Sequence, residues 1–441
     1  MKVAVVGSGI AGLAAAHHLA RHTEITLFEA GSYFGGHTHT VDVALPVDGR
    51  ETAHGVDTGF LVYNERTYPH LIALFKELGV ETAKSDMSFS VQVAAHGTRE
   101  SIEWSGSSLN TVFAQRRNLF NPQFLGMLRD LLRFNTLTTG IAESGLESSM
   151  QQPLGDFLRE HRFGEAFCNW YFLPMMACIW SCPTDQMLRF PVATMVRFCH
   201  NHGLLQVTNR PQWWTVRGGA RHYVAKILAH IADKRLNTPV RSIRRRGQTE
   251  GGGVLLATDS GTELFDKVVI ATHSDQALSL LADPTPTERE ALGAIRYHRN
   301  RAVLHTDATV LPSRKAAWAA WNYESHPPQG GAAGQDNQVC LHYLINMLQP
   351  VPWQQPVVVS LNPLREIPPA CVLGDFDYAH PVFDAAATRA QARITRNQGL
   401  AGTYYSGAWL GYGFHEDGLK SGNAAAQQIL DVLHKPGGAG K

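Results

Sequence analysis

Three glycines and one carboxylate near the start of the chain have the spacing that binds a dinucleotide. Gly7, Gly9 and Gly12 form a G-x-G-x-x-G pattern, and Glu29 follows 17 positions after Gly12. The glycines serve a tight turn, close approach of the backbone to a pyrophosphate, and close packing of a helix on a strand. A carboxylate at this distance accepts hydrogen bonds from ribose hydroxyls and repels a 2′-phosphate. We expect a dinucleotide pocket made by Gly7, Ser8, Gly9, Ile10, Ala11, Gly12, Glu29 and Ala30.

The residues around this pattern predict the strand–helix–strand unit that would position it. A β-branched run covers 3–6, helix formers fill 13–19, and a second apolar run covers 25–28. The helix would begin near Gly9 and direct its unpaired N–H groups and positive dipole end at the phosphates. A secretory signal peptide is the alternative, but it needs an unbroken apolar core, and basic and imidazole side chains occupy 17–22.

The composition favours a soluble protein of two or three domains. Among 441 residues the net charge is +1 and only 17% are charged, and no basic stripe is interleaved with aromatics, so we expect no nucleic-acid partner. Six cysteines without CxxC or zinc spacing indicate a reducing compartment, and we expect no metal. No stretch approaches the ~20 apolar residues of a membrane span, so we expect a cytoplasmic protein.

Further along the chain, the patterns change character several times. A helix is predicted over 68–80, with Pro69 in its first turn. Helices with Pro and Gly punctuation are expected from about 104 to 205, and strands return from 238 to 272. The C-terminal part pairs a strand with a glycine-rich crossover and a helix beginning near Gly418.

Six motifs occur in a recognisable order: "GSGIAGL…FEA", "FGGHTHT", "VDTGF", "TPVRSI", "DKVVIAT" and "SGAWLGYGFHEDGLKSGNAAAQQIL". This series resembles the flavin-containing amine oxidase superfamily, which includes monoamine oxidases, protoporphyrinogen oxidases and carotenoid desaturases. The segments "DMSFSV", "IWSCP", "FCHNHGLLQV", "RPQWWTV" and "AAWAAWN" add a closer likeness. They resemble the FAD-binding region that precedes the methyltransferase domain of plant cyclopropane fatty acid synthases, and its stand-alone bacterial relatives.

The resemblance implies an α/β fold with a Rossmann-type, glutathione-reductase-like FAD-binding domain, an interleaved mixed-sheet substrate domain and a helical insertion. By position, the FAD-binding domain would comprise 1–85, 210–285 and 400–434. The helical insertion would be 86–209, the substrate domain 286–399, and 435–441 a flexible tail.

The resemblance also assigns cofactor contacts beyond the first motif. Gly35, Gly36, His37 and Thr38 would approach the diphosphate and ribityl chain, Gly59 and Phe60 the flavin, and Val240 the adenine. Gly407, Ala408, Gly418 and Leu419 would close the site, with the N–H groups of the last helix aimed at the flavin's N1–C2=O edge.

This sequence departs from the family pattern in four places. His37 stands where an arginine usually follows the glycine doublet, and Ala408 where an acid is usual. No lysine occurs in the strand over 293–307, where amine oxidases carry one near flavin N5. The segment 404–409 lacks the cysteine that tethers FAD in monoamine oxidases, so we expect the cofactor to be non-covalent.

His415 falls where an aromatic residue frames the amine in amine oxidases, and it would act as acid, base or orienting donor. The alternative is a histidine bonded to a backbone carbonyl, and for Asp417 we expect a helix cap. We expect hydride transfer from an apolar substrate, such as an unsaturated or methylated acyl chain, to flavin N5. The alternatives are a true amine oxidase and a flavin-bearing accessory subunit of a lipid-modifying methyltransferase, and contact with a membrane surface is a further expectation. The expected substrate-lining residues are Trp213, Trp321, Tyr343 and Tyr412.

Overall fold

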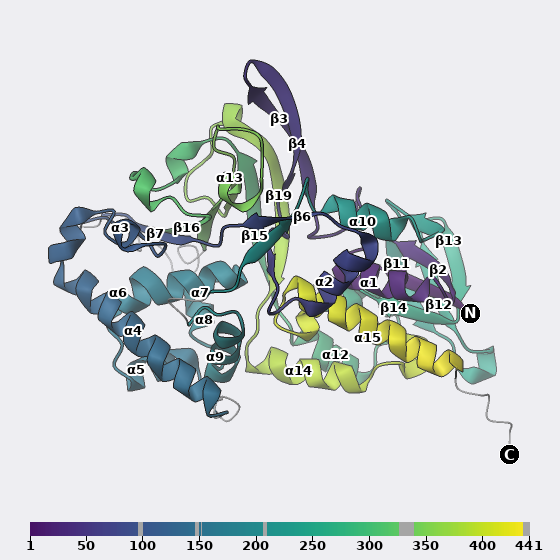
Figure 1. Ribbon diagram of the computed structural model, residues 1–441. Helices are drawn as coiled ribbons and strands as arrows, with labels where there is room; N and C mark the ends of the chain where they lie inside the picture. Colours follow the sequence, from purple (N-terminus) through teal and green to yellow (C-terminus); the bar gives the residue numbers. More distant parts are fainter. Residues whose placement is uncertain (96–99, 146–149, 151, 206–209, 326–338, 435–441) are drawn as a thin grey trace.

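The computed structural model describes residues 1–95, 100–145, 150, 152–205, 210–325 and 339–434. The expected flexible tail, 435–441, lies outside the described residues. Figure 1 shows two lobes. The first lobe holds α1 (Ile10–Leu19) and α15 (His415–His434), and a helical lobe with α4 (Pro122–Glu143) and α9 (Val192–Asn201) lies at the other end. The hairpin of β3 and β4 projects from between them (Figure 1).

A five-stranded parallel sheet forms the core of the first lobe. Its order is β10-β2-β1-β14-β20, so β1 is the central strand. The apolar run Val268–Ile270 belongs to β14, which is buried between β1 and β20. Four of the five residues of β1 and of β2 are buried, because helices and loops cover both faces. The strands are β1 (Lys2–Val6), β2 (Glu24–Phe28), β10 (Asp233–Arg235), β14 (Lys267–Ile270) and β20 (Thr403–Tyr405).

Two helices cross closely above this sheet, α1 (Ile10–Leu19) and α15 (His415–His434). Their contact depends on glycines in α15, because a Cβ on Gly422 would lie 2.1 Å from the Ala11 carbonyl oxygen. A Cβ on Gly418 would lie 2.6 Å from Ile10 Cγ2. The last helix begins at His415, three residues before the expected start near Gly418.

A second layer covers the opposite side of the first sheet. The antiparallel sheet of β11 (Val240–Arg245), β12 (Val254–Thr258) and β13 (Gly261–Phe265) shares a core with α11 (Ser274–Leu280), α12 (Pro286–Gly293) and α14 (Ala385–Arg396). Residues of α12 and α14 fall within 286–399, which the sequence assigns to the substrate domain. Their buried faces instead pack with Val6 and Phe28 of the first sheet, so that range divides between two lobes.

A seven-stranded mixed sheet stands beside the first lobe, in the order β19-β15-β18-β17-β16-β7-β8. Only β16 and β7 pair in parallel. Because β7 and β8 belong to this sheet, 86–209 is not wholly helical, and its helical part begins with α3. The strands are β7 (Phe89–Val93), β8 (Ile102–Ser105), β15 (Tyr297–His305), β16 (Trp321–Ser325), β17 (Cys340–Leu344), β18 (Val358–Leu361) and β19 (Val372–Pro381).

The helical lobe follows from apolar segments divided by Pro and Gly. Its longest helix, α4 (Pro122–Glu143), begins at Asn121, whose Oδ1 accepts from two backbone N–H groups. The others are α3 (Leu109–Val112), α5 (Leu154–Glu160), α6 (Glu165–Phe167), α7 (Leu173–Trp180), α8 (Thr184–Met187) and α9 (Val192–Asn201). Within the described residues, no helix combines the length and apolarity needed to span a membrane.

Smaller elements connect the lobes. The helix predicted over 68–80 is α2 (Pro69–Leu78), with Pro69 in its first turn as expected. The others are β3 (Thr40–Val47), β4 (Arg50–Asp57), β5 (Tyr63–Asn64), β6 (Thr82–Ser85), β9 (Trp213–Val216), α10 (Arg221–Leu228) and α13 (Ile345–Leu348).

Candidate active site

One cavity of about 600 Å³ joins the glycine-rich turn after β1 to an aromatic chamber between the lobes. It brings together most of the residues that the sequence singles out, although they lie in widely separated parts of the chain. The predicted residues that line it are Gly7, Ser8, Gly9, Ile10, Ala11, Glu29, Ala30, Gly35, Gly36, His37, Thr38, Gly59, Phe60, Trp213, Val240, Trp321, Tyr343, Gly407, Ala408 and His415. Gly12, Tyr412, Gly418 and Leu419 are not among the lining residues.

The turn between β1 and α1 gives the cavity a backbone-lined end. Gly7 has φ +98°, and a Cβ there would lie 2.9 Å from the Ala271 carbonyl oxygen. Gly12 lies inside α1, where a Cβ would lie 1.9 Å from the Gly7 carbonyl oxygen, so it serves packing of the helix on the turn. No side chain caps α1 at Gly9, so within the described residues its first N–H groups are left for a ligand. This end is suited to a diphosphate.

Glu29, at the end of β2, holds the glycine turn in place. Its carboxylate accepts from the backbone N–H of Ser8 at 3.0 Å and of Gly31 at 2.8 Å, and from the Ser8 hydroxyl. A carboxylate offers about four acceptor positions, so capacity remains for ribose hydroxyls. Among the described lining residues, Glu29 is the only one with a charged side chain.

Three histidines line the middle of the cavity. The His37 ring lies 6.1 Å from the His273 ring and 5.4 Å from the His380 ring, measured between centroids. Burial lowers the pKa of His37 to about 4 and that of His380 to about 3, so both are neutral near pH 7. The buried Nε2 of His37 has no partner within the described residues. A neutral imidazole therefore occupies the position where the family resemblance predicts a cationic arginine.

His415 lies at the start of α15 with its ring fixed from two sides. Its Nε2 is 2.6 Å from the Tyr223 hydroxyl, which is 2.8 Å from Thr38 Oγ1. The ring stacks on Phe60 with 3.8 Å between centroids and 13° between planes. Burial lowers the pKa of His415 to about 3, because the ring is surrounded by protein and its charged form is poorly solvated there. A weakly basic, fixed ring is suited to orienting a ligand rather than to accepting a proton.

The two acids after His415 stabilise neighbouring backbone. Asp417 Oδ2 accepts from the N–H groups of Tyr412 and Phe414, each at 3.0 Å, which agrees with the expected capping role. Glu416 accepts from the N–H groups of His70 and Leu71, at the start of α2.

These contacts correct the expectation for Gly418. Its N–H donates to the Phe414 carbonyl and is committed to the helix, so the free N–H groups belong to the turn that starts at His415. Leu419 is buried in the core.

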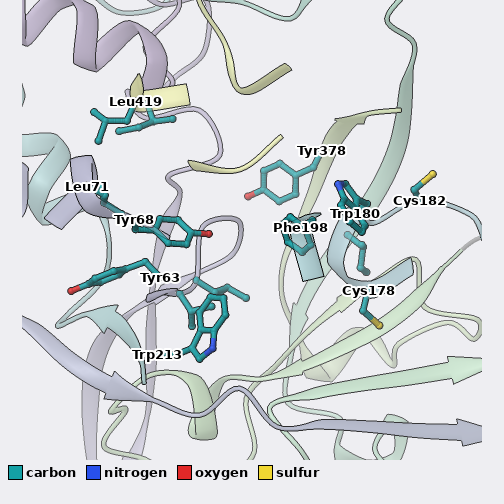
Figure 2. Close-up of a cluster of buried hydrophobic side chains, with 14 of the residues drawn as sticks. Tyr63, Tyr68, Leu71, Cys178, Trp180, Cys182, Phe198, Trp213, Tyr378 and Leu419 are labelled. Atoms are coloured by element: carbon teal, nitrogen blue, oxygen red, sulfur yellow. The ribbon is translucent and has the colours of Figure 1, made fainter. Parts of the chain in front are cut away.

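The far end of the cavity is an apolar chamber. Figure 2 shows Tyr68 and Trp213 on one side and Phe198 and Cys178 on the other, and all four line the cavity. Tyr412 is not among the described lining residues; it precedes the lining residues Gly413 and Phe414, and its carbonyl oxygen accepts from Trp180 Nε1 at 3.3 Å. Further lining residues that the sequence did not predict include Met87, Ile179, Leu204, His202, Tyr297 and Phe414.

Some of these residues carried no local signal. Tyr223, which does not line the cavity but holds His415, sits in an ordinary amphipathic helix, and His380 lies near the end of β19, where exposure no longer alternates along the strand. Phe414 could have been included, because it precedes His415 in the motif that the sequence singles out.

The family model of the flavin-containing amine oxidoreductases matches residues 10–328. The chain therefore belongs to this family of flavin-containing oxidoreductases, and it has an α/β fold with mixed sheets.

Individual relatives are more distant. A carotenoid phi-ring synthase of Streptomyces griseus is 29% identical over 337 residues, which are 71% of this chain and 59% of that protein. The chain thus aligns with about three fifths of this curated relative's length. The fold is shared with a cyclohexylamine oxidase from Brevibacterium oxydans (TM-score 0.65, 15% identity, 98% of this chain and 99% of that chain). It is also shared with a fatty acid isomerase from P. acnes (TM-score 0.64, 14% identity, 98% of each chain).

Proposed function

We propose that this chain binds FAD non-covalently and oxidises or isomerises an uncharged, apolar substrate such as an unsaturated or methylated acyl chain. The observation that carries the proposal is one cavity that joins the glycine turn to an aromatic chamber whose described lining residues include no Asp, Glu, Lys or Arg. When bound, FAD supplies the two-electron acceptor for a hydride that leaves a substrate carbon.

The chamber favours a neutral ligand over an ammonium ion. A buried cation requires a counter-ion or a dense set of acceptors. His202 is an imidazole among the chamber residues, and burial lowers its pKa to about 4, so it does not supply a charge. Trp213, Trp321 and Tyr343 would contact apolar chain on several sides. Aromatic faces also attract cations, by about 2 kcal/mol or more in desolvated sites, so amines belong in the test.

The residues at the nucleotide end fit FAD. The turn at Gly7 and Gly9 with the start of α1 would hold the diphosphate, and Glu29 the ribose. A Cβ on Gly59 would lie 2.2 Å from the His37 carbonyl oxygen, so the backbones at His37 and Gly59 approach closely beside the place where the flavin ring would lie. His415, held by Tyr223, would orient the ring or the substrate beside it.

Two relatives support the apolar substrate class by their names. One is a carotenoid phi-ring synthase and the other a fatty acid isomerase, and carotenoids and fatty acyl chains are both long and apolar. The resemblance to the FAD-binding region of plant cyclopropane fatty acid synthases favours the acyl chain and a lipid-modifying methyltransferase as partner.

The edge of the helical lobe offers a surface for lipid. Leu109 and Phe120 are 80% and 85% exposed, and Leu119, Leu125 and Leu132 are exposed beside them in the sequence. Residues 106–137 carry four arginines, all exposed, and one acid, which is buried. Exposed apolar side chains among positive charges are suited to an anionic membrane surface, from which an acyl chain would be taken.

The test is anaerobic mixing of the flavin-loaded protein with phospholipids that bear unsaturated or mid-chain-methylated acyl groups, and with simple amines in parallel. Loss of flavin absorbance with the lipid alone would support the proposal, and product analysis would then locate the new double bonds. Loss with an amine alone would overturn the substrate class. If neither substrate reduces a fully loaded flavin and product analysis of the lipid finds no new or shifted double bond, the accessory role beside a methyltransferase replaces the proposal.

A further inference from the structure

We propose that Glu324, Cys340 and His342 form a Zn²⁺ site behind the wall of the substrate chamber. Glu324 lies on β16 directly opposite Cys340 of β17, and His342 follows two residues later on the same face. Successive side chains of a strand alternate between faces. Because Trp321 and Tyr343 line the cavity, the three proposed ligands belong to the opposite face of the seven-stranded sheet.

The three donor atoms are close enough to share one ion. Nε2 of His342 is 2.8 Å from Glu324 Oε2 and 3.4 Å from Cys340 Sγ, and the sulfur is 3.8 Å from the same carboxylate oxygen. Zn–S, Zn–N and Zn–O bonds of about 2.3, 2.1 and 2.0 Å in a tetrahedron place such atoms roughly 3.3 to 3.6 Å apart. Movements of about 0.5 Å would therefore complete the geometry, and a water would take the fourth position.

The histidine is oriented from behind in the manner of a metal ligand. His342 Nδ1 is 2.6 Å from Ser360 Oγ, which is 2.7 Å from His305 Nε2. The backbone N–H of Asp307 donates to His305 Nδ1 at 3.1 Å, so in neutral His305 the proton is on Nε2 and points to Ser360. Such outer contacts fix the ring of a ligating histidine and leave its other nitrogen toward the ion.

The surroundings of Cys340 suit a thiolate that is bound to a cation. The residue is fully buried. A carboxylate beside a buried sulfur is unfavourable for a thiolate alone. A bound Zn²⁺ reverses this, because one thiolate and one carboxylate balance its charge, and the combination of sulfur, nitrogen and oxygen donors is one that Zn²⁺ accepts.

The consequence would be mechanical rather than catalytic. The ion would join β16 to β17 immediately behind Trp321 and Tyr343, whose rings lie 4.9 Å apart. It would hold this part of the chamber wall in place without contacting the flavin.

The experiment uses the flavin-loaded protein, treated with a chelator, dialysed, and then incubated with ZnCl₂ or CoCl₂. We expect about one Zn²⁺ per chain and a higher Tm. With Co²⁺ we expect tetrahedral d–d absorption at longer wavelengths than the flavin absorbs. Cys340→Ser, His342→Gln and Glu324→Gln should each remove most of the metal while flavin content is unchanged, and Ser360→Ala should weaken binding by about 10-fold or more.

Cys371→Ser is the matched control, because Cys371 is a half-buried free thiol that directly precedes β19 of the seven-stranded sheet and is not one of the proposed ligands. Glu324→Gln is nearly isosteric and partly exposed, so it keeps the test valid if Cys340→Ser fails to fold. Less than about 0.1 Zn²⁺ per chain with no change in Tm would overturn the proposal. So would metal binding that survives Glu324→Gln and His342→Gln, or that Cys371→Ser removes equally.

Discussion

Removal of the Tyr223 hydroxyl should lower the free energy of unfolding, because this group makes two hydrogen bonds. In Tyr223→Phe the ring remains, but the partners at 2.6 Å (His415 Nε2) and 2.8 Å (Thr38 Oγ1) both lose their contact. Tyr223 and Thr38 are buried, and Thr38 and His415 both line the cavity, where water can replace only part of what the hydroxyl supplies to them. An unsatisfied buried partner costs about 1–3 kcal/mol, and the expected loss is about 2 kcal/mol.

Thermal and urea unfolding of the flavin-free protein would measure this loss. With roughly 2 °C per kcal/mol for a protein of this size, Tm should fall by about 4 °C. Tyr404→Phe is the control, because Tyr404 is equally buried and, within the described residues, no hydrogen bond of its hydroxyl is seen. If Tyr223→Phe costs less than about 0.5 kcal/mol, or no more than Tyr404→Phe, the hydrogen-bonded chain from Thr38 to His415 does not stabilise the fold as we argue.

Three further perturbations test other parts of the structure. Gly422→Ala should lower the free energy of unfolding by several kcal/mol in a urea titration, because the added Cβ would lie 2.1 Å from a backbone oxygen of α1. Gly140→Ala in α4 is the control: nothing lies within 4 Å of its added Cβ, so the variant should be neutral or more stable by about 1 kcal/mol. The flavin-free protein should lose stability as the pH falls from about 6.5 towards 4, because the folded pKa values of His37, His380 and His415 (about 4, 3 and 3) lie below the unfolded value of 6.5. At about pH 5.5 each histidine should lower the free energy of unfolding by at most about 1 kcal/mol relative to about pH 6.5. A Tm that does not change over this pH range would contradict the burial of these rings in their neutral form. Leu109→Ser with Phe120→Ser should reduce sedimentation with phosphatidylglycerol vesicles by about 10-fold, whereas Leu264→Ser, at another exposed leucine, should not; equal binding by both variants would exclude this edge as the lipid surface.

The first thirty residues show how far local pattern reaches. Gly12 packs against the carbonyl of Gly7 in the same turn, and β1, α1 and β2 follow one another with short connections. These features lie close together in the sequence, so the strand–helix–strand unit can be predicted from spacing, whereas the contact of Gly7 with Ala271, beyond β14, could not. The start of α15 was misplaced by three residues, because two acids and a histidine fit both a loop and a first helical turn.

Domain boundaries were less accessible from the sequence. The helices α12 and α14 are amphipathic in the ordinary way, and nothing in their composition states which sheet their apolar faces will cover. The strands β7 and β8 are short and pair with each other, and the other partner of β7, β16, lies more than 200 residues further along the chain. Pairing across such separation depends on the whole fold.

The sequence by itself determined that this chain carries the glycine spacing typical of a dinucleotide-binding turn, a family motif series and an aromatic-rich remainder, because those features depend on residue type and short spacing. Only the tertiary structure decided that Tyr223 holds His415, that Glu416 caps a helix 346 residues away, and that Glu324 meets Cys340 and His342. Side chains that meet across lobes or strands need no common sequence spacing. Their chemistry depends on burial and partners, which exist only once the chain has folded.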